Sequence, residues 1–263
     1  MSYNQTLMNS ERVIIIFGPT SSGKTALSLK ITDYISKKSG IESEIISADS
    51  RQVYKGMNIG TAKVSKNIQK SYRHHFLDIL PPTKQYSSRE FAKDAKIKID
   101  EITDRGHIPI IVGGTGTYVM GLVGDSYMKG APGAKKPSGS LMLVPAFERQ
   151  SLYRKIEANV DQMLKDGLYG ELKNIISNYH AVPKQIGKTH GYREFIEYAK
   201  QNKKNVFKLN QVDLEKIKHR IKVDTKKYAM HQIGWLNKME GYQIVKDFQQ
   251  VEALIDDFLG VTK

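Results

Sequence analysis

The chain has 263 residues, of which 40% are hydrophobic and 26% charged, proportions typical of a globular protein with a buried core. It contains no cysteine, which excludes disulfides, thiolate metal sites and cysteine nucleophiles. No stretch approaches the roughly 18 uninterrupted apolar residues of a membrane-spanning helix. The net charge of +14 favours polyanionic partners, chiefly nucleic acid, although a lysine-rich solvated surface gives the same sum.

Residues 1–12 are polar and lack the apolar segment of a signal peptide, so we interpret them as a short leader before the first strand. Together with the absence of cysteine, this fits a cytoplasmic protein without membrane association. No feature of the sequence indicates an obligatory protein partner.

Strands and helices are predicted to alternate through the first half of the chain. Residues 12–17, 44–47 and 107–112 are short and rich in β-branched residues, as buried parallel strands are. Residues 26–38 and 87–105 carry apolar side chains at helical spacing. This alternation predicts an α/β fold, with a parallel sheet flanked by helices like that of P-loop NTPases.

The composition changes after residue 124. Residues 129–140 are rich in Gly, Pro, Ser and Lys and offer nothing to a core, which predicts a flexible linker. Residues 141–144 read as one more strand, and helical periodicity follows in four segments: 148–166, 169–179, 190–200 and 213–239. The chain thus divides into the first part of a P-loop core, a linker, and the remainder of the core with C-terminal helices: 1–124, 125–140 and 141–263.

A phosphate-binding loop is predicted at residues 18–25. Their sequence, GPTSSGKT, fits G-x-x-x-x-G-K-[ST] and lies between a predicted strand and a predicted helix. In such a loop, backbone N–H groups surround a phosphate at a helix N-terminus. Lys24 would neutralise the terminal phosphate, and the Thr25 hydroxyl would bind Mg²⁺. The motif predicts a di- or triphosphate ligand without saying whether it is a nucleotide.

An acidic residue, Asp49, follows the second predicted strand. In doubly wound sheets, the carboxyl ends of the strands face the ligand crevice. A carboxylate there can act as a general base or hold Mg²⁺ through water, although an aspartate at such a position also commonly caps a helix. The amide of Gln52 can pair with N6 and N7 of adenine, or it is an ordinary polar surface group.

A second glycine turn, GGTGT at residues 113–117, follows the third strand. It would bring backbone groups and the Thr115 hydroxyl to the same crevice, although such turns are common in α/β proteins. His74 and His75 are adjacent, so on regular structure they cannot face one metal, and we favour a structural role for them.

Taken together, these strings resemble the tRNA dimethylallyltransferase (tRNA isopentenyltransferase) family. The resemblance covers about residues 13–236 apart from the linker, and it is carried by GPTSSGKTAL, ADSRQVYKGMNIGTAK, HHFLDIL, IPIIVGGTGTYV, LYRKIEANVDQMLKDGL, GYREF and DTKKYAMHQIGWL. The second string is far more specific than the phosphate loop, because no generic P-loop kinase carries it together with GGTGTY.

The resemblance implies a reaction and a role for each matched residue. A dimethylallyl group would pass from dimethylallyl diphosphate to N6 of the adenine at position 37 in the tRNA anticodon loop, with Mg²⁺ present. Asp49 would accept the N6 proton, and Lys24 and Thr25 would steady the leaving diphosphate. The diphosphate would be held by Gly18, Thr20, Ser21, Ser22, Gly23, Lys24, Thr25 and Arg193. The flipped-out base would contact Asp49, Ser50, Arg51, Gln52, Thr115 and Gly116.

Three departures from the family pattern stand out. Residues 124–141 replace a helical insertion that grips the anticodon stem-loop, which should weaken tRNA binding and admit water. Lys155 and Asn159 stand where the family carries arginines, one of which usually lies at the diphosphate, and an amide cannot stabilise a leaving diphosphate as a guanidinium does. The segment 225–235 is less basic than in the family, and Trp235 is expected in the core.

Three other functions stay open at this point. The same chemistry on free AMP is favoured by the missing insertion, whereas the intact second string and the net charge favour tRNA. A catalytically impaired homologue that only binds RNA would fit Asn159 and the missing insertion. A nucleotide kinase would rest on the phosphate loop alone.

Overall fold

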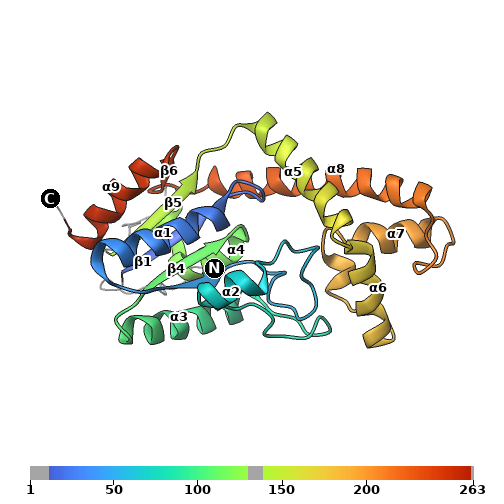
Figure 1. The fold of residues 1–263 in the computed structure, drawn as a ribbon, viewed down its shortest axis with the longest axis horizontal. Coiled ribbons are helices and arrows are strands. Elements are labelled where there is room, and N and C mark those ends of the chain that lie inside the picture. The colour runs from blue at the N-terminus through green and yellow to red at the C-terminus, as the bar shows by residue number, and fades with distance from the viewer. Residues whose placement is uncertain (1–11, 130–138, 262–263) are drawn as a thin grey trace.

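The computed structural model describes residues 12–129 and 139–261, so most of the predicted linker lies outside the described residues. Within them, six strands form one parallel sheet in the order β3-β2-β4-β1-β5-β6 (Figure 1). The strands are β1 (Val13–Phe17), β2 (Ser43–Ser47), β3 (His74–His75), β4 (Ile108–Gly113), β5 (Ser140–Pro145) and β6 (Gln243–Val245). The predicted α/β fold with a parallel sheet is therefore confirmed.

Helices cover both faces of the sheet because alternate residues of the central strands point to opposite sides. On one face, Ile14 and Ile16 pack with α1 (Lys24–Ser39) and α9 (Phe248–Leu259). On the other, Ile15 and Phe17 pack with α3 (Ser88–Asp104) and α4 (Gly116–Val123). A capping box of Ser87 and Glu90 begins α3. The short α2 (Lys66–Ser71) precedes β3.

A helical arm extends from the sheet body, on the right in Figure 1. It contains α5 (Arg149–Lys165), α6 (Leu168–Tyr179), the 3-10 turn η2 (Ile186–Lys188), α7 (Arg193–Gln201) and α8 (Gln211–Leu236). The helices share a second core, which includes Leu172, Phe195 and Ile217. With 26 residues, α8 is about 39 Å long, so it reaches from the arm back to the sheet.

The predicted strands at 12–17, 44–47, 107–112 and 141–144 correspond to β1, β2, β4 and β5. The structure adds the short edge strands β3 and β6 and the helix α9. After α4, the chain forms the 3-10 turn η1 (Gly124–Tyr127), where the Tyr127 hydroxyl is 2.7 Å from that of Ser140. In the part of the chain that is described, no helix is long and apolar enough to span a bilayer.

Candidate active site

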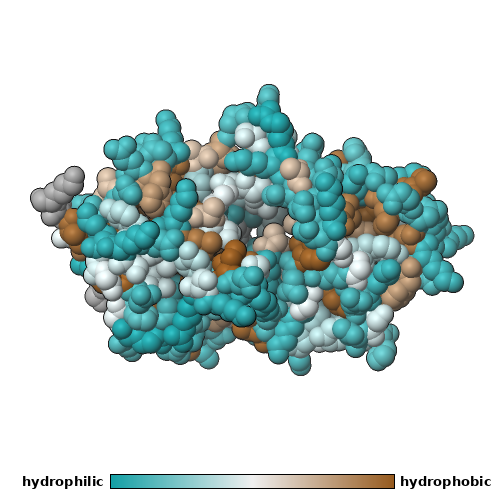
Figure 2. Space-filling model, in the orientation of Figure 1, coloured by the Kyte–Doolittle hydropathy of each residue, from teal (hydrophilic) through white to brown (hydrophobic). Residues whose placement is uncertain are grey.

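A cleft of about 870 Å³ opens where the carboxyl ends of β1, β2 and β4 meet the helical arm. The face drawn in Figure 2 is hollowed near its centre, between the sheet body and the arm. The walls of the cleft are the phosphate loop, the turn after β2, the glycine turn after β4, and side chains of α5 and α8. Segments far apart in the sequence thus converge on the sheet edge where P-loop proteins bind ligands.

The phosphate loop forms one wall of this cleft. Thr20, Ser21, Gly23, Lys24 and Thr25 line the cleft, whereas Gly18 and Ser22 are buried behind them. The ammonium of Lys24 donates to the Pro19 carbonyl at 2.7 Å. Burial lowers the pKa of Lys24 to about 8, and the negative charge of Asp49 acts in the opposite direction. A bound phosphate would therefore raise the pKa of Lys24 and stabilise its charged form.

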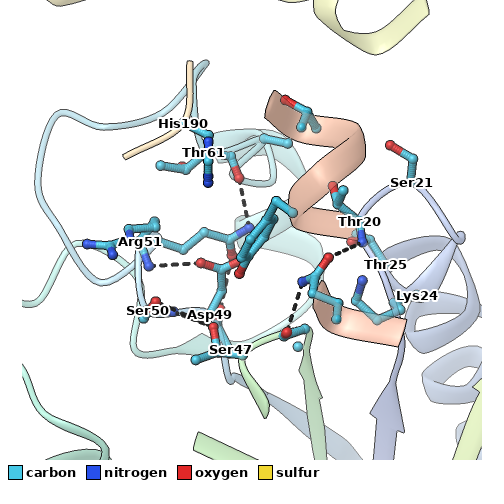
Figure 3. Close-up of a pocket in the computed structure, with 18 of the residues that line it drawn as sticks. Thr20, Ser21, Lys24, Thr25, Ser47, Asp49, Ser50, Arg51, Thr61 and His190 are labelled. Carbon is cyan, nitrogen blue, oxygen red and sulfur yellow. Dashed lines mark hydrogen bonds between the residues drawn. The ribbon is translucent and has the colours of Figure 1, made fainter. Parts of the chain in front are cut away.

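The turn after β2 forms a second wall and carries Asp49 into the cleft (Figure 3). Asp49 Oδ1 accepts a hydrogen bond of 2.8 Å from the backbone N–H of Arg51, which fixes the carboxylate. The Ser50 N–H donates to Thr115 Oγ1 at 3.1 Å and so joins this turn to the glycine turn after β4. Arg51 also lines the cleft, and its guanidinium donates to Gln185.

Gln52 lines the cleft with its amide already bonded at both ends. Its Oε1 accepts from the Ser47 hydroxyl at 3.0 Å, and its Nε2 donates to the Thr61 carbonyl at 3.2 Å. To read an adenine edge, the side chain would have to exchange these partners.

The C-terminal half of α8 lies across both glycine-containing loops. Gln232 is 3% exposed, and it accepts from the Thr20 N–H and donates to the Gly114 carbonyl, both at 2.8 Å. A Cβ at Gly114 would lie 2.2 Å from Gln232 Nε2, and one at Gly116 would lie 2.3 Å from the Trp235 ring. These two glycines are therefore required by the close approach of α8.

Two further residues of α8 face the cleft. Tyr228 lines the cleft, and its pKa is raised to about 12 by burial, with the Asp49 charge adding to the shift. Neither Gln232 nor Tyr228 was predicted from the sequence as a site residue. The available signal for Gln232 is its polar side chain on the apolar stripe that contains Ala229 and Leu236. Trp235 packs against the core and also lines the cleft, so it is only in part the core residue that was expected.

The structure does not bring Arg193 to the phosphate loop. Its guanidinium lies 3.1 Å from Glu194 and 3.0 Å from Asp224, and it is not among the described residues that line the cleft. With Glu197 at 3.6 Å, three carboxylates already neutralise its charge. On α5, by contrast, Lys155 and Asn159 both line the cleft, and Asn159 Nδ2 donates to the Ser21 hydroxyl at 2.9 Å.

The two adjacent histidines belong to β3 and serve different contacts. His75 Nε2 lies 2.6 Å from the buried carboxylate of Glu44, which also binds Arg105 and His107. The ring of His74 hydrogen-bonds the carbonyl of Tyr72. Across residues 12–129 and 139–261, no group of three or more His, Cys, Asp or Glu could hold a metal.

The fold and the cleft define a class: P-loop α/β proteins in which a phosphate loop and an acidic turn face each other at the sheet edge. Comparison with known families is more specific, since the IPP transferase family model matches residues 52–140 and 126–239. The chain therefore belongs to the IPP transferase family.

Similar proteins agree with this assignment. The tRNA dimethylallyltransferase of Oenococcus oeni is 38% identical over 234 residues, which are 86% of this chain and 84% of that protein. That of Lactococcus lactis subsp. cremoris is 30% identical over 287 residues, 89% of this chain and 92% of that protein. Among solved structures, the tRNA isopentenylpyrophosphate transferase of Bacillus halodurans has a TM-score of 0.76 and 26% identity, covering 96% of both chains.

Proposed function

We propose that this protein transfers a dimethylallyl group from dimethylallyl diphosphate to N6 of an adenine in tRNA, the base at position 37 of the anticodon loop. One observation carries the proposal: Asp49 and the phosphate loop share a single cleft, close enough for the Asp49 charge to act on Lys24. Relatives named tRNA dimethylallyltransferase support the choice of group and acceptor.

In the proposed reaction, the N6 lone pair attacks C1 of the dimethylallyl group. The C1–O bond breaks, and the diphosphate leaves with the bonding electron pair. N6 becomes cationic as the new bond forms, and its proton passes to the Asp49 carboxylate, which the Arg51 N–H holds in place. A base with this acceptor atom must leave the anticodon stack to enter the cleft.

The wall formed by the phosphate loop, here called the donor wall, supplies positive charge where the leaving group develops negative charge. We assign the diphosphate to the backbone N–H groups of the phosphate loop and to Lys24. Lys155 lines the same cleft, one turn of α5 from the Asn159 amide that touches the loop. Lys155 supplies a positive charge at one of the two positions where the family pattern carries arginine.

The residues present fit a Mg²⁺ ion bound together with the diphosphate. The exposed residue Thr25 lines the cleft, and its hydroxyl is a hard oxygen donor of the kind that Mg²⁺ prefers. The ion would neutralise the diphosphate oxygens. Protein ligands this few are usual for Mg²⁺, which keeps waters and substrate phosphates in its shell.

The wall formed by the turns after β2 and β4 is here called the acceptor wall. On it, we assign contacts with the base to Ser50, Arg51, Thr115 and Gly116, with Gln52 shaping the wall through Ser47 and Thr61. The partner is proposed to be the anticodon stem-loop of tRNA, attracted by a net charge of +14.

Incubation with labelled dimethylallyl diphosphate and Mg²⁺, with either unmodified tRNA or AMP, tests the proposal. We expect transfer to tRNA, its loss in Asp49→Ala, and its retention in Asp104→Ala, which removes an exposed carboxylate at the end of α3. Transfer to AMP but not to tRNA would show that the acceptor is a free nucleotide. Absence of transfer to either would refute the activity.

A further inference from the structure

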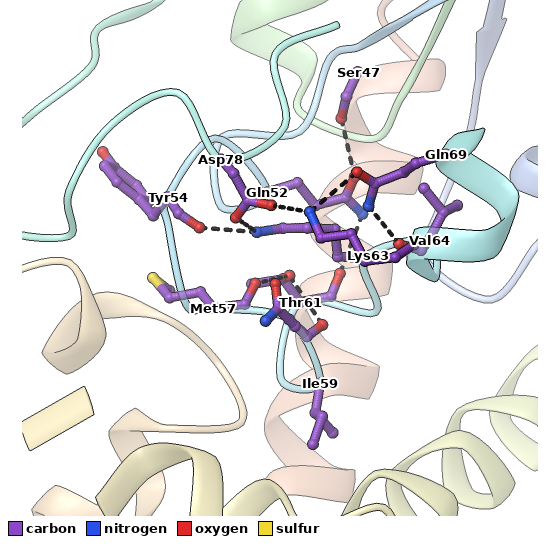
Figure 4. Close-up of polar contacts among 12 residues, drawn as sticks. Ser47, Gln52, Tyr54, Met57, Ile59, Thr61, Lys63, Val64, Gln69 and Asp78 are labelled. Carbon is purple, nitrogen blue, oxygen red and sulfur yellow. Dashed lines mark hydrogen bonds and ion pairs between the residues drawn. The ribbon is translucent and has the colours of Figure 1, made fainter. Parts of the chain in front are cut away.

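Lys63 ends the most specific string of the sequence, and its side chain is enclosed. The side chain is 1% exposed, and its ammonium donates to the Tyr54 carbonyl at 2.8 Å and to Asp78 Oδ1 at 2.6 Å (Figure 4). Burial lowers the pKa of Lys63, while the hydrogen bond and charge of Asp78 oppose the lowering. A buried ammonium is costly unless it is paired and hydrogen-bonded, so both partners define its place.

Through these bonds Lys63 joins three segments of backbone. Residues 52–55 and 78–80 pair, with the Asp78 N–H donating to the Gln52 carbonyl at 3.2 Å and the Leu80 N–H to the Val53 carbonyl at 3.0 Å. The loop 57–63 ends at Lys63, whose own N–H donates to the Asn58 carbonyl at 3.0 Å. The ammonium thus links the end of this loop to both paired segments, through the Tyr54 carbonyl and Asp78.

The same loop reaches the cleft through Thr61. The Thr61 carbonyl accepts the hydrogen bond from Gln52 Nε2, and Gln52 Oε1 accepts from the hydroxyl of Ser47 at the end of β2 (Figure 4). Ser47, Gln52 and Thr61 all line the cleft. A continuous path of bonded groups therefore runs from Lys63 to the turn that carries Asp49.

The other end of the loop is held separately by the helical arm. The carboxylate of Glu171 on α6 accepts from the backbone N–H groups of residues 58–60 and from the Tyr192 hydroxyl. Glu171 fixes where the loop begins, and Lys63 fixes where it ends. Removal of the Lys63 anchor should thus free the part that contains Thr61 without detaching the arm.

We propose that Lys63 is a positioning residue for the acceptor adenine. Its ammonium holds the 57–63 loop so that the Thr61 carbonyl orients Gln52 and, through Ser47, the turn of Asp49. This role rests on the proposed function, because it concerns the acceptor wall of that same site.

Lys66 offers a matched control. It binds the other oxygen of Asp78 at 3.0 Å, but its side chain is 69% exposed, and the structure gives it no bond to Tyr54. In Lys63→Met, we expect kcat/KM for unmodified tRNA to fall about tenfold or more, since small displacements near reacting groups are costly. The KM for dimethylallyl diphosphate should stay within about twofold. Lys66→Met should change neither constant.

A double-mutant cycle separates positioning from a general loss of structure. If Lys63 acts through Gln52, the double variant Lys63→Met/Gln52→Met should be hardly worse than the more impaired single variant. Additive losses would overturn the proposal, as would equal losses for donor and acceptor. If Lys63→Met does not fold, Asp78→Asn replaces it in the cycle, because it weakens the same anchor while keeping an acceptor for the ammonium.

Hydrogen exchange of the peptide containing residues 57–64 gives a readout independent of turnover. Faster exchange there in Lys63→Met, and not in Lys66→Met, is expected. If the unaltered protein transfers no dimethylallyl group to tRNA, the proposed function fails. If it does transfer the group, but Lys63→Met leaves exchange or kcat/KM for tRNA unchanged, the role of Lys63 fails.

Discussion

Replacement of Gln232 by leucine should loosen α8 from the two loops that form the cleft. Gln232→Leu keeps the apolar stem but removes the acceptor for the Thr20 N–H and the donor to the Gly114 carbonyl. Each lost hydrogen bond costs about 1–1.5 kcal/mol when its partner stays enclosed. We therefore expect roughly 2–3 kcal/mol less stability.

Chemical denaturation followed by circular dichroism and by tryptophan fluorescence measures this effect. Trp235 is the only tryptophan, it lies one turn from Gln232, and its ring packs against Gly116, so its emission reports the contact of α8 with the loops. In Gln232→Leu, the fluorescence transition should precede that of circular dichroism, because the end of α8 releases before the sheet unfolds.

Gln211→Leu is the matched control, since Gln211 is exposed at the start of the same helix. It should change stability by less than about 0.5 kcal/mol. A loss in Gln232→Leu no greater than that of the control would refute the view that this side chain ties α8 to both loops. Diphosphate affinity should also fall in Gln232→Leu, because the Thr20 backbone is no longer held.

Other predictions concern charge. Lys155→Gln should weaken inorganic pyrophosphate binding and Asn159→Arg should strengthen it, each about tenfold by titration calorimetry; no change in either would refute a role for this face of α5. Because the pKa of Lys24 is lowered to about 8, pyrophosphate affinity should fall as pH rises through that value, and Lys24→Met should lack this step. Hydrogen bonds from histidine and arginine hold the pKa of Glu44 at about 2 against the effect of burial. A carboxyl group whose pKa is lowered on folding stabilises the protein above its ordinary pKa of 4.5. Glu44 should therefore account for about 3 kcal/mol of the stability lost as pH falls from 4.5 to 2, and Glu44→Gln should lose about that much less across the same window.

Local patterns made much of the fold predictable. The phosphate loop depends on the spacing of residues 18–25, and the central strands are short apolar runs with turns at their ends. The edge strands β3 and β6 have two and three residues, too few for any period to show. Helix α9 did carry a signal, since Asp247 caps it and residues 251, 255 and 259 form its buried stripe.

The long-range contacts of the cleft were not predictable in the same way. Gln232 and Gly114 are 118 positions apart, and only the path of α8 brings them together. Arg193 was predicted as a phosphate ligand because it is a cation. In the folded protein, where α7 packs against α8, its guanidinium forms ion pairs with Glu194 and Asp224 instead. Residue type indicates what a side chain can bind, whereas the packing of the helices determines which partner lies within reach of it.

The same packing explains why the donor and acceptor walls form one unit. The Thr20 backbone is bonded to Gln232, Gln232 to Gly114, and the Thr115 hydroxyl to the turn of Asp49. Among the described residues, none between 118 and 154 lines the cleft, so this unit is built without the segment that contains the predicted linker. A helical insertion at that place would therefore add grip on the RNA or cover from water, while the geometry of Asp49 against the phosphate loop is set by β2, β4 and α8.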